Sequence, residues 1–156
     1  MVYIAVVGGS PCSAQEYAQA YAVGKEIARV NAVLICGGGS GVMEAAAKGA
    51  AENGGISLGI LPGEHIDQGN SYLTYAIATG LGEARNAIIA RTADFMIAVG
   101  GEYGTLSEIA LALKMGKPVI GLSSWSLIAP HPPGSSIVAA ETASESVEKG
   151  LSQVKS

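Results

Sequence analysis

Two charged residues beside glycine clusters, Arg85 and Glu108, could together act on an anionic ligand. Arg85 falls in the first turn of a helix predicted over 82–92, where the helix dipole disfavours a cation by roughly a few tenths of a kcal/mol. A bound anion or a carboxylate partner would explain its position. Glu108 follows Thr105 by three residues, so the two also match a capping box, in which the carboxylate only caps a helix. We expect Arg85 and a carboxylate from a neighbouring glycine turn to face one pocket.

Thirteen of the 22 glycines gather in five clusters, and four of these clusters follow a predicted strand and precede a helix. The four lie at residues 8–9, 37–41, 80–82 and 100–104. Glycine at such a turn lets the backbone approach a ligand closely and presents N–H groups at a helix N-terminus. Because parallel strands end at one edge of a sheet, we expect a ligand site there. The alternative is that glycine serves only the tight turns of a small α/β protein.

The expected ligand is an anionic small molecule, because amide-rich turns at helix N-termini bind anions. The residues expected to bind it are Gly8, Gly9, Ser10, Gly38, Gly39, Ser40, Gly41, Glu44, Asn86, Gly100, Gly101, Gly104 and Thr105. His65 and Asp67 fall in the loop 62–70 at the same edge of the sheet. A lining or lid role and a solvated loop both stay open for these two residues.

The glycine clusters lack the motifs of several other chemistries. The run 37–41 lacks G-x-G-x-x-G spacing, and the next strand offers Ser57 and Leu58 in place of the acid that binds a ribose. No cluster continues as Gly-Lys-Ser/Thr, and no lysine falls in a glycine turn. NAD-dependent redox chemistry, ATP hydrolysis and pyridoxal phosphate decarboxylation are therefore not expected. No metal site is expected, because zinc-ligand spacing is lacking among Cys12, Cys36, His65 and His131.

The composition bounds the class of protein. The 156 residues are 49% hydrophobic and only 14% charged, with a net charge of −4. These values favour one compact domain over residues 1–156, without the basic patch of a nucleic-acid-binding protein. No membrane helix or signal peptide is recognised, and two cysteines form no disulfide framework. A cytoplasmic location with reduced thiols is therefore expected.

Short apolar runs alternate with longer amphipathic stretches, which is typical of βαβ units. The predicted strands cover residues 2–7, 32–35, 56–60, 73–78, 95–99 and 118–121. The first helix begins after Ser13, which forms a capping box with Glu16. The other predicted helices cover 41–52, 82–92, 105–115 and 141–154, and the proline-rich stretch 123–136 is predicted to be irregular. This order predicts a three-layer αβα sandwich around a mostly parallel sheet of six or seven strands.

Three ordered motifs carry a resemblance to a known family. They are Gly37-Gly38-Gly39-Ser40-Gly41-Val42-Met43-Glu44, Gly82-Glu83-Ala84-Arg85-Asn86 and Gly100-Gly101-Glu102-Tyr103-Gly104-Thr105-Leu106-Ser107-Glu108. Over roughly residues 1–122 the chain resembles the Lonely Guy-like (SLOG) superfamily, long mislabelled as lysine decarboxylases. The resemblance implies a Rossmann-like, nucleotide-binding domain. Family enzymes are phosphoribohydrolases that cleave the N-glycosidic bond of nucleoside 5′-monophosphates, and their arginine and glutamate match Arg85 and Glu108. The short form of the motifs is most similar to the branch that includes molybdenum cofactor carrier proteins.

Three positions depart from the family pattern. Gly100 replaces a proline, Glu102 replaces a glycine, and Asn86 replaces the lysine after the arginine. An inward-pointing Glu102 would oppose a bound phosphate, whereas an outward-pointing one would cost little. The loss of the lysine removes a cation from the expected site.

The resemblance leaves several functions open. In an enzyme, Glu108 would stabilise an oxocarbenium-like state or activate water while Arg85 holds the phosphate, and no cofactor would be required. In a non-catalytic carrier or sensor, the same amides would hold a nucleotide, or the molybdenum cofactor (molybdopterin) as cargo. A third hypothesis is an oligomeric scaffold with a vestigial site. The resemblance and the low charge together imply a homodimer or homotetramer.

Overall fold

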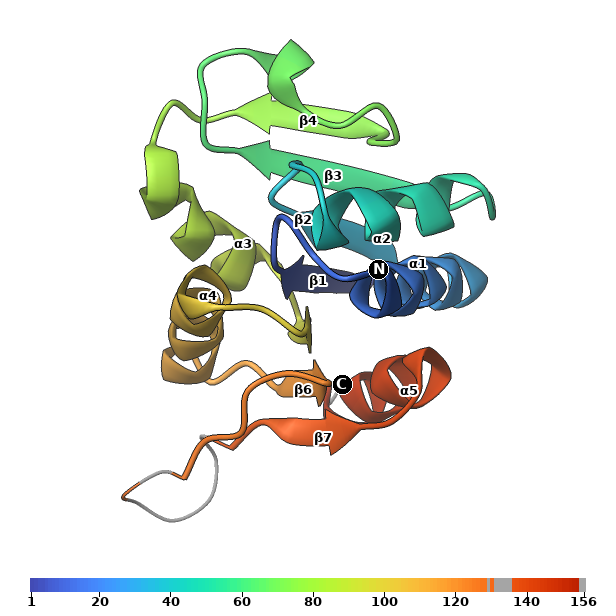
Figure 1. Cartoon of the computed structure of the whole chain (residues 1–156), viewed down its shortest axis with the longest axis vertical. Helices are drawn as coiled ribbons and strands as arrows, with labels where there is room; N and C mark the ends of the chain where they lie inside the picture. The colour runs from blue at the N-terminus through green and yellow to red at the C-terminus, as the bar shows by residue number, and fades with distance from the viewer. Residues whose placement is uncertain (129, 131–135, 155–156) are drawn as a thin grey trace.

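A computed structural model describes residues 1–128, 130 and 136–154 of the chain (Figure 1). The strands are β1 (Tyr3–Gly8), β2 (Val33–Cys36), β3 (Ile56–Leu61), β4 (Tyr75–Ala78), β5 (Phe95–Val99), β6 (Val119–Leu122) and β7 (Val138–Ala140). The α-helices are α1 (Ala14–Arg29), α2 (Val42–Ala51), α3 (Asn86–Thr92), α4 (Tyr103–Lys114) and α5 (Ala143–Gln153). Two short 3₁₀ helices, η1 (Ile66–Gln68) and η2 (Gly82–Arg85), flank β4. None of these helices is long and apolar enough to cross a membrane.

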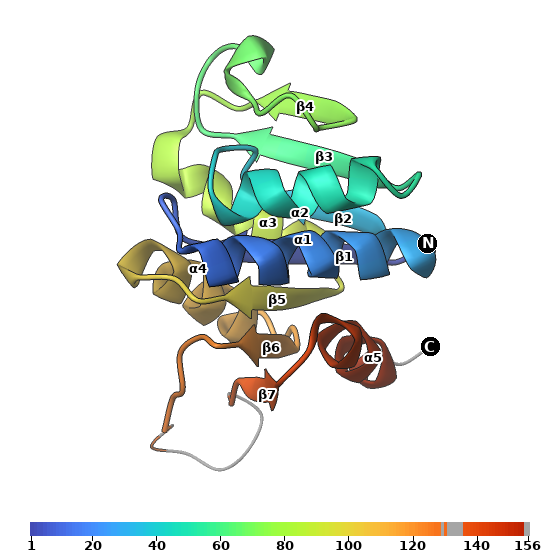
Figure 2. The same cartoon turned by 45° about the vertical axis from the view of Figure 1, so that its right-hand side comes forward.

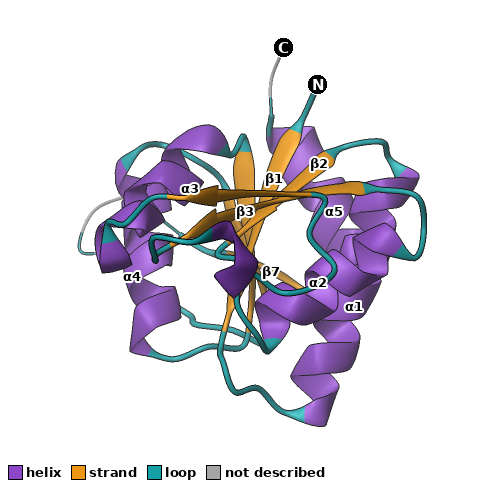
Figure 3. Ribbon diagram, turned by 90° about the horizontal axis from the view of Figure 1, so that it is seen from above, coloured by secondary structure: helices purple, strands orange, loops and turns teal. Residues whose placement is uncertain are grey.

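The seven strands form one parallel sheet in the order β4-β3-β2-β1-β5-β6-β7. Helices α1, α2 and α5 lie on one face of this sheet and α3 and α4 on the other, as seen from above in Figure 3. The expected three-layer, Rossmann-like α/β architecture is therefore confirmed. The direction of strand succession reverses between β1 and β5, and this switch point is where ligands bind in such sheets.

The sheet is buried on both faces, which explains why its strands are nearly continuous apolar runs. In β1, Ile4 and Val6 face the core under α1, α2 and α5, whereas Ala5 and Val7 face the core under α3 and α4. All five residues of β5 are buried beside them. The two central strands thus form a rigid base whose carboxyl ends carry the glycine turns.

The helix starts agree with the sequence to within one residue for α1 and α2 and differ for α3, α4 and α5, the last of which begins at Ala143 in place of residue 141. The Ser13–Glu16 capping box is confirmed, with both reciprocal hydrogen bonds present at 2.9 and 3.1 Å. The helix expected over 82–92 is divided into η2 and α3, and Arg85 lies at their junction. The Thr105–Glu108 capping box is wrong, because α4 begins at Tyr103 and Thr105 lies inside its first turn.

The early start of α4 has a backbone cause. Gly100 and Gly101 adopt φ angles of 55° and 100°, which side chains rarely tolerate, so the chain turns sharply before residue 102. Glu102 is then the N-cap residue, and its side chain makes no capping hydrogen bond. Glu108 is consequently released from the capping role that its spacing suggested.

The seventh strand, β7, is a finding of the structure that the sequence pattern does not predict. It has only three residues, Val138–Ala140, and pairs with β6 through the register Ile120 to Val138. Such a short segment after a proline-rich stretch carries too little periodicity to identify it. It extends the sheet beyond β6 and leads into α5.

Helices α1 and α2 lie side by side across one face of the sheet (Figure 2) and are in backbone contact at two glycines. A Cβ atom on Gly24 would lie 2.0 Å from the Ala46 carbonyl oxygen, and one on Gly49 would lie 2.0 Å from the Tyr21 carbonyl oxygen. Neither neighbour is a flexible side chain, so the helices would have to separate.

Replacing Gly49 with alanine is expected to destabilise the fold by about 1–3 kcal/mol, as overpacking typically does. For a domain of this size each kcal/mol lowers the melting temperature by roughly 2–4 °C, which thermal unfolding followed by circular dichroism measures. Gly104→Ala is the matched control, because a Cβ atom there meets nothing within 4 Å. Equal melting temperatures for the two variants would contradict the close helix contact.

Candidate functional site

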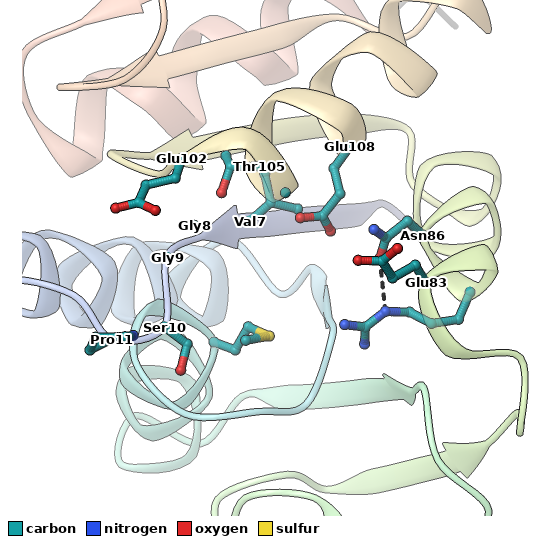
Figure 4. Close-up of a pocket in the computed structure, with 13 residues that line it drawn as sticks. Val7, Gly8, Gly9, Ser10, Pro11, Glu83, Asn86, Glu102, Thr105 and Glu108 are labelled. Atoms are coloured by element: carbon teal, nitrogen blue, oxygen red, sulfur yellow. Dashed lines mark hydrogen bonds between the residues drawn. The ribbon is translucent and has the colours of Figure 1, made fainter.

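A cavity of about 330 Å³ lies at the switch point between β1 and β5 (Figure 4). Four segments form its walls: the turn after β1, the first turn of α2, the η2–α3 junction, and the start of α4 with its N-cap residue. The lining residues are Val7, Gly8, Gly9, Ser10, Pro11, Met43, Glu83, Arg85, Asn86, Glu102, Gly104, Thr105 and Glu108. The cavity therefore lies at the carboxyl ends of the central strands, the edge of the sheet at which the sequence predicts a ligand site.

The turn after β1 is locked against the glycine run that begins α2. The Val42 N–H donates to the Gly9 carbonyl oxygen at 3.1 Å, and the hydroxyls of Ser10 and Ser40 are hydrogen-bonded to each other. Gly41 has a φ of 69°, and a Cβ atom there would lie 2.4 Å from the Gly9 carbonyl oxygen. The two turns thus form one rigid wall.

Arg85 is held by three hydrogen bonds of 2.7 Å. Its Nε donates to the Asn86 Oδ1, and its Nη1 donates to the carbonyl oxygens of Gly37 and Ile60, at the ends of β2 and β3. Within the described chain no carboxylate lies at ion-pair distance from Arg85. The guanidinium is thus fixed in place while its charge stays available to a ligand.

Glu108 faces the same cavity from α4 and lies across from Asn86 in Figure 4. Burial raises the pKa of Glu108 from 4.5 to about 7, and the positive charge of Arg85 opposes this rise. Burial likewise lowers the pKa of Arg85, and the charge of Glu108 opposes that change. The expected juxtaposition of one cation and one carboxylate in one pocket is therefore present, at a distance that leaves them unpaired.

The N–H groups of the glycine turns differ in whether they are free to donate a hydrogen bond to a ligand. The Gly38 N–H faces the sulfur of Cys36, and the Gly39 N–H donates to the Met43 sulfur at 3.4 Å. The Gly100 N–H donates to the Leu122 carbonyl oxygen at 3.2 Å. By contrast, no acceptor among the described residues takes the N–H groups of Gly101 or of the first turn of α4, Tyr103 to Thr105. The available donors therefore come from the α4 turn, where the helix dipole also favours an anion.

The predicted binding residues fall into two groups. Those that line the switch-point cavity are Gly8, Gly9, Ser10, Arg85, Asn86, Gly104, Thr105 and Glu108. Those that do not line it are Gly38, Gly39, Ser40, Gly41, Glu44, Gly100 and Gly101. Gly38 and Gly39 line a neighbouring cavity instead, together with Met43 and Arg85.

Five lining residues are not among the predicted binding residues: Val7, Pro11, Met43, Glu83 and Glu102. The signal was present for Met43, which lies in the first turn of α2 directly after the glycine run. It was present also for Glu83, two residues before Arg85 in the same short turn. Val7 and Pro11 carry no chemical signal and line the cavity through their position beside the first glycine pair.

Two of the three departures from the family motifs, Asn86 and Glu102, lie in the cavity lining and have distinct outcomes. Asn86 supplies no charge, but its side chain orients Arg85. Glu102 is exposed, and Figure 4 shows its side chain at the opposite end of the cavity from Asn86, directed away from Glu108. With Glu83 and Glu108, it makes three carboxylates against one arginine in the cavity lining. An anion bound here would depend strongly on Arg85.

The other polar candidates lie apart from this cavity. His65 and Asp67 are exposed and line a shallow separate hollow beside η1 and β4. His131 lies outside the described residues. Cys36 is buried and burial raises its pKa to about 11, which leaves the thiol protonated. Among the described residues no group of three or more His, Cys, Asp and Glu side chains could hold a metal ion.

Solved structures with whole-chain similarity include molybdenum cofactor proteins. The molybdenum cofactor binding protein of Rippkaea orientalis is 34% identical, with a TM-score of 0.85 over 99% of this chain and 96% of that one. The molybdenum cofactor carrier protein of Chlamydomonas reinhardtii is 32% identical, with a TM-score of 0.80 over 97% and 99% of the two chains.

Sequence comparison adds two relatives and a family. An uncharacterised protein of Archaeoglobus fulgidus is 49% identical over 78% of this chain and 80% of its own length. The cytokinin riboside 5′-monophosphate phosphoribohydrolase LOG5 of Arabidopsis thaliana is 40% identical, but over only 49% of this chain and 35% of its own. The model of the SLOG cluster4 family matches residues 1–153. The chain therefore belongs to the SLOG cluster4 family, within the superfamily that its three motifs indicated.

Proposed function

We propose that this protein binds a phosphorylated small molecule at the switch point and carries it without turnover, in the manner of a molybdenum cofactor carrier. The observation that carries the proposal is Arg85, a cation fixed by three hydrogen bonds in a cavity, with no carboxylate partner among the described residues. A half-buried cation without a counter-ion is costly unless a ligand supplies the negative charge. The phosphate of a pterin cofactor or of a nucleotide would do so.

The comparisons support the carrier over the enzyme. The molybdenum cofactor proteins match nearly the whole of this chain, whereas the phosphoribohydrolase match covers 49% of it. In addition, Asn86 replaces the second cation of the enzyme motif and is engaged in orienting Arg85. A single arginine suffices to hold a phosphate, and a carrier needs no group that attacks a glycosidic bond.

Hydrolysis of a nucleoside 5′-monophosphate is the second candidate, and one observation favours it. Glu108 is free of a capping role, faces the cavity beside Arg85, and has a pKa of about 7. A carboxyl group with such a pKa can donate a proton to a leaving base, or as carboxylate stabilise an oxocarbenium-like state. The same group in a carrier would only tune the charge of the site.

The carrier predicts saturable binding of molybdopterin and of nucleoside monophosphates, with a rise in melting temperature and no product. The rise follows from linkage, because ligand at 100 times Kd adds roughly 2.7 kcal/mol to the free energy of unfolding. Differential scanning fluorimetry measures the binding, and chromatography of the same samples detects free base. Base release that Glu108→Gln abolishes would contradict the carrier and establish the hydrolase.

The homodimer or homotetramer expected from the sequence stays a prediction. Its support is a group of exposed apolar side chains on the edge strand β4 and the turns beside it. Their exposed fractions are 65% for Tyr75, 49% for Ile77, 65% for Ile66 and 54% for Leu81.

A further inference from the structure

A second cavity of about 440 Å³ lies beside the switch-point cavity and shares Arg85 and Met43 with it. It is formed by the glycine run after β2 and by the segment from the end of β3 to η1. A Cβ atom on Gly37 would lie 2.6 Å from Arg85 Nη1 and 2.8 Å from Met43 Sδ, so both side chains pack directly on this glycine. They form the partition between the two cavities.

The backbone carbonyl groups around the second cavity are already hydrogen-bonded within the protein. Arg85 and Asn70 donate to the carbonyl oxygens of residues 37–39, at 2.7 to 3.0 Å. Thr79, Gly80 and Gly82 donate to those of residues 61–63, at 2.6 to 3.2 Å. The N–H groups of Gly38 and Gly39 face sulfur atoms. A ligand in this cavity therefore finds a wall with few free polar backbone groups.

The side chains of the second cavity are mainly apolar. Met43, Leu61 and Pro62 line it, and the Leu61 side chain lies so close to Gly38 that a Cβ atom there would be 2.2 Å from it. The methionine sulfur makes favourable contacts with aromatic rings. Such a surface suits a flat heterocycle and does not suit a phosphate.

Gln68 is the one uncharged polar side chain in the described lining of the second cavity. A Cβ atom on Gly63 would lie 2.0 Å from Gln68 Oε1, so the carboxamide rests over this glycine at the cavity wall. No hydrogen bond joins the Gln68 side chain to another described residue. The Gln68 carboxamide has an NH₂ group that donates and an oxygen that accepts. The edge of a purine or pterin ring offers an acceptor and a donor side by side, which complement these two groups.

We infer that the second cavity is the subsite for the ring of the ligand, and that Gln68 recognises the ring edge by hydrogen bonding. The inference rests on the proposed function, because it needs the phosphate in the switch-point cavity. Arg85 and Met43 then lie between phosphate and ring. The ligand class is narrowed to a phosphorylated flat heterocycle that carries a donor and an acceptor side by side.

Guanosine 5′-monophosphate and ribose 5-phosphate separate the two subsites, because only the first carries a flat heterocyclic base. Isothermal titration calorimetry is expected to show the nucleotide binding about tenfold tighter or more, since ring contacts and a hydrogen bond add to the phosphate. A Cβ atom on Gly63 meets only the flexible end of Gln68, so Gly63→Leu adds an apolar side chain at the wall of the second cavity and displaces the Gln68 carboxamide. The Gly63→Leu variant is expected to bind the nucleotide no more tightly than ribose 5-phosphate, and to bind ribose 5-phosphate as tightly as the unmodified protein does. Gln68→Leu is expected to weaken nucleotide binding by about threefold to tenfold.

Gln153→Leu at the end of α5 is the matched control, because Gln153 lines a different hollow with Lys117 and Pro118. Unchanged ribose 5-phosphate binding also shows that each variant is folded. If neither ligand binds the unmodified protein, the proposed function fails and this inference with it. If the unmodified protein binds ribose 5-phosphate and the nucleotide equally tightly, only the ring subsite is overturned. The same holds if Gly63→Leu still binds the nucleotide about tenfold tighter than ribose 5-phosphate. Full nucleotide affinity in Gln68→Leu would overturn the role of Gln68.

Discussion

Replacing Arg85 with alanine is expected to weaken binding of ribose 5-phosphate by about 100-fold, the equivalent of about 2.7 kcal/mol. The guanidinium is the one cation in the described lining of the switch-point cavity, where it stands against the carboxylates of Glu83, Glu102 and Glu108. Without it, a phosphate would meet only uncharged polar groups and acidic side chains. Calorimetric titration of the purified variant at fixed low salt measures the loss.

Arg85 also has a structural role that must be separated from binding. Its Nη1 donates to two carbonyl oxygens, of Gly37 and Ile60, so the alanine variant leaves both without that donor and is expected to melt at a lower temperature. Titration is therefore carried out well below the melting temperature of the variant. Arg91→Ala is the control, because Arg91 is exposed in the last turn of α3. An Arg85→Ala protein that is folded and binds with unchanged affinity would rule out the anion site.

Much of the fold could be predicted from the sequence because parallel strands buried on both faces have a recognisable hydrophobic pattern. Each strand is a short apolar run, and glycine follows β1, β2, β4 and β5 where the chain turns toward the ligand edge. The shared edge then follows from parallel topology alone. That reasoning was sufficient to place Arg85 and Glu108 at one cavity, although they are 23 residues apart in the chain.

The direction of individual peptide groups could not be predicted. Gly38 and Gly39 carry the same motif as a phosphate-binding turn, yet their N–H groups face the sulfur atoms of Cys36 and Met43. A sequence shows which residues can turn but not which way each amide points. The distinction between a capping and a cavity-facing Glu108 also depended on a two-residue shift in the start of α4, which the φ angles at Gly100 and Gly101 determine.

The stability of the protein is expected to fall as pH rises from about 4.5 to about 7 through the ionisation of Glu108. The pKa of this group is about 7 in the folded protein against 4.5 as its ordinary value, because burial disfavours the charged form. In that interval the unfolded chain releases a proton that the folded chain keeps, so ionisation favours unfolding as pH increases. The full effect is about 3 kcal/mol above pH 7 and vanishes below pH 4.5.

Glu108→Gln is the test, since glutamine keeps the shape of the side chain and cannot ionise. The variant is expected to match the unmodified protein in denaturant unfolding at pH 4.5 and to exceed it in stability at pH 8. Glu148→Gln is the matched control, because Glu148 is exposed on α5. Glu16 is unsuitable for this purpose because its side chain closes the capping box of α1. A stability difference that is the same at both pH values would contradict the raised pKa.

The same variant distinguishes the two candidate functions through ligand binding. A phosphate beside Arg85 favours the protonated form of Glu108, so the affinity of the unmodified protein for ribose 5-phosphate is expected to decrease as pH rises through 7. In Glu108→Gln the decrease in affinity caused by ionisation of Glu108 is absent, so at pH 8 the variant binds ribose 5-phosphate more tightly than the unmodified protein does. A carrier shows only this change in affinity. A hydrolase would show in addition a loss of base release, because the proton donor or carboxylate that the reaction needs is gone.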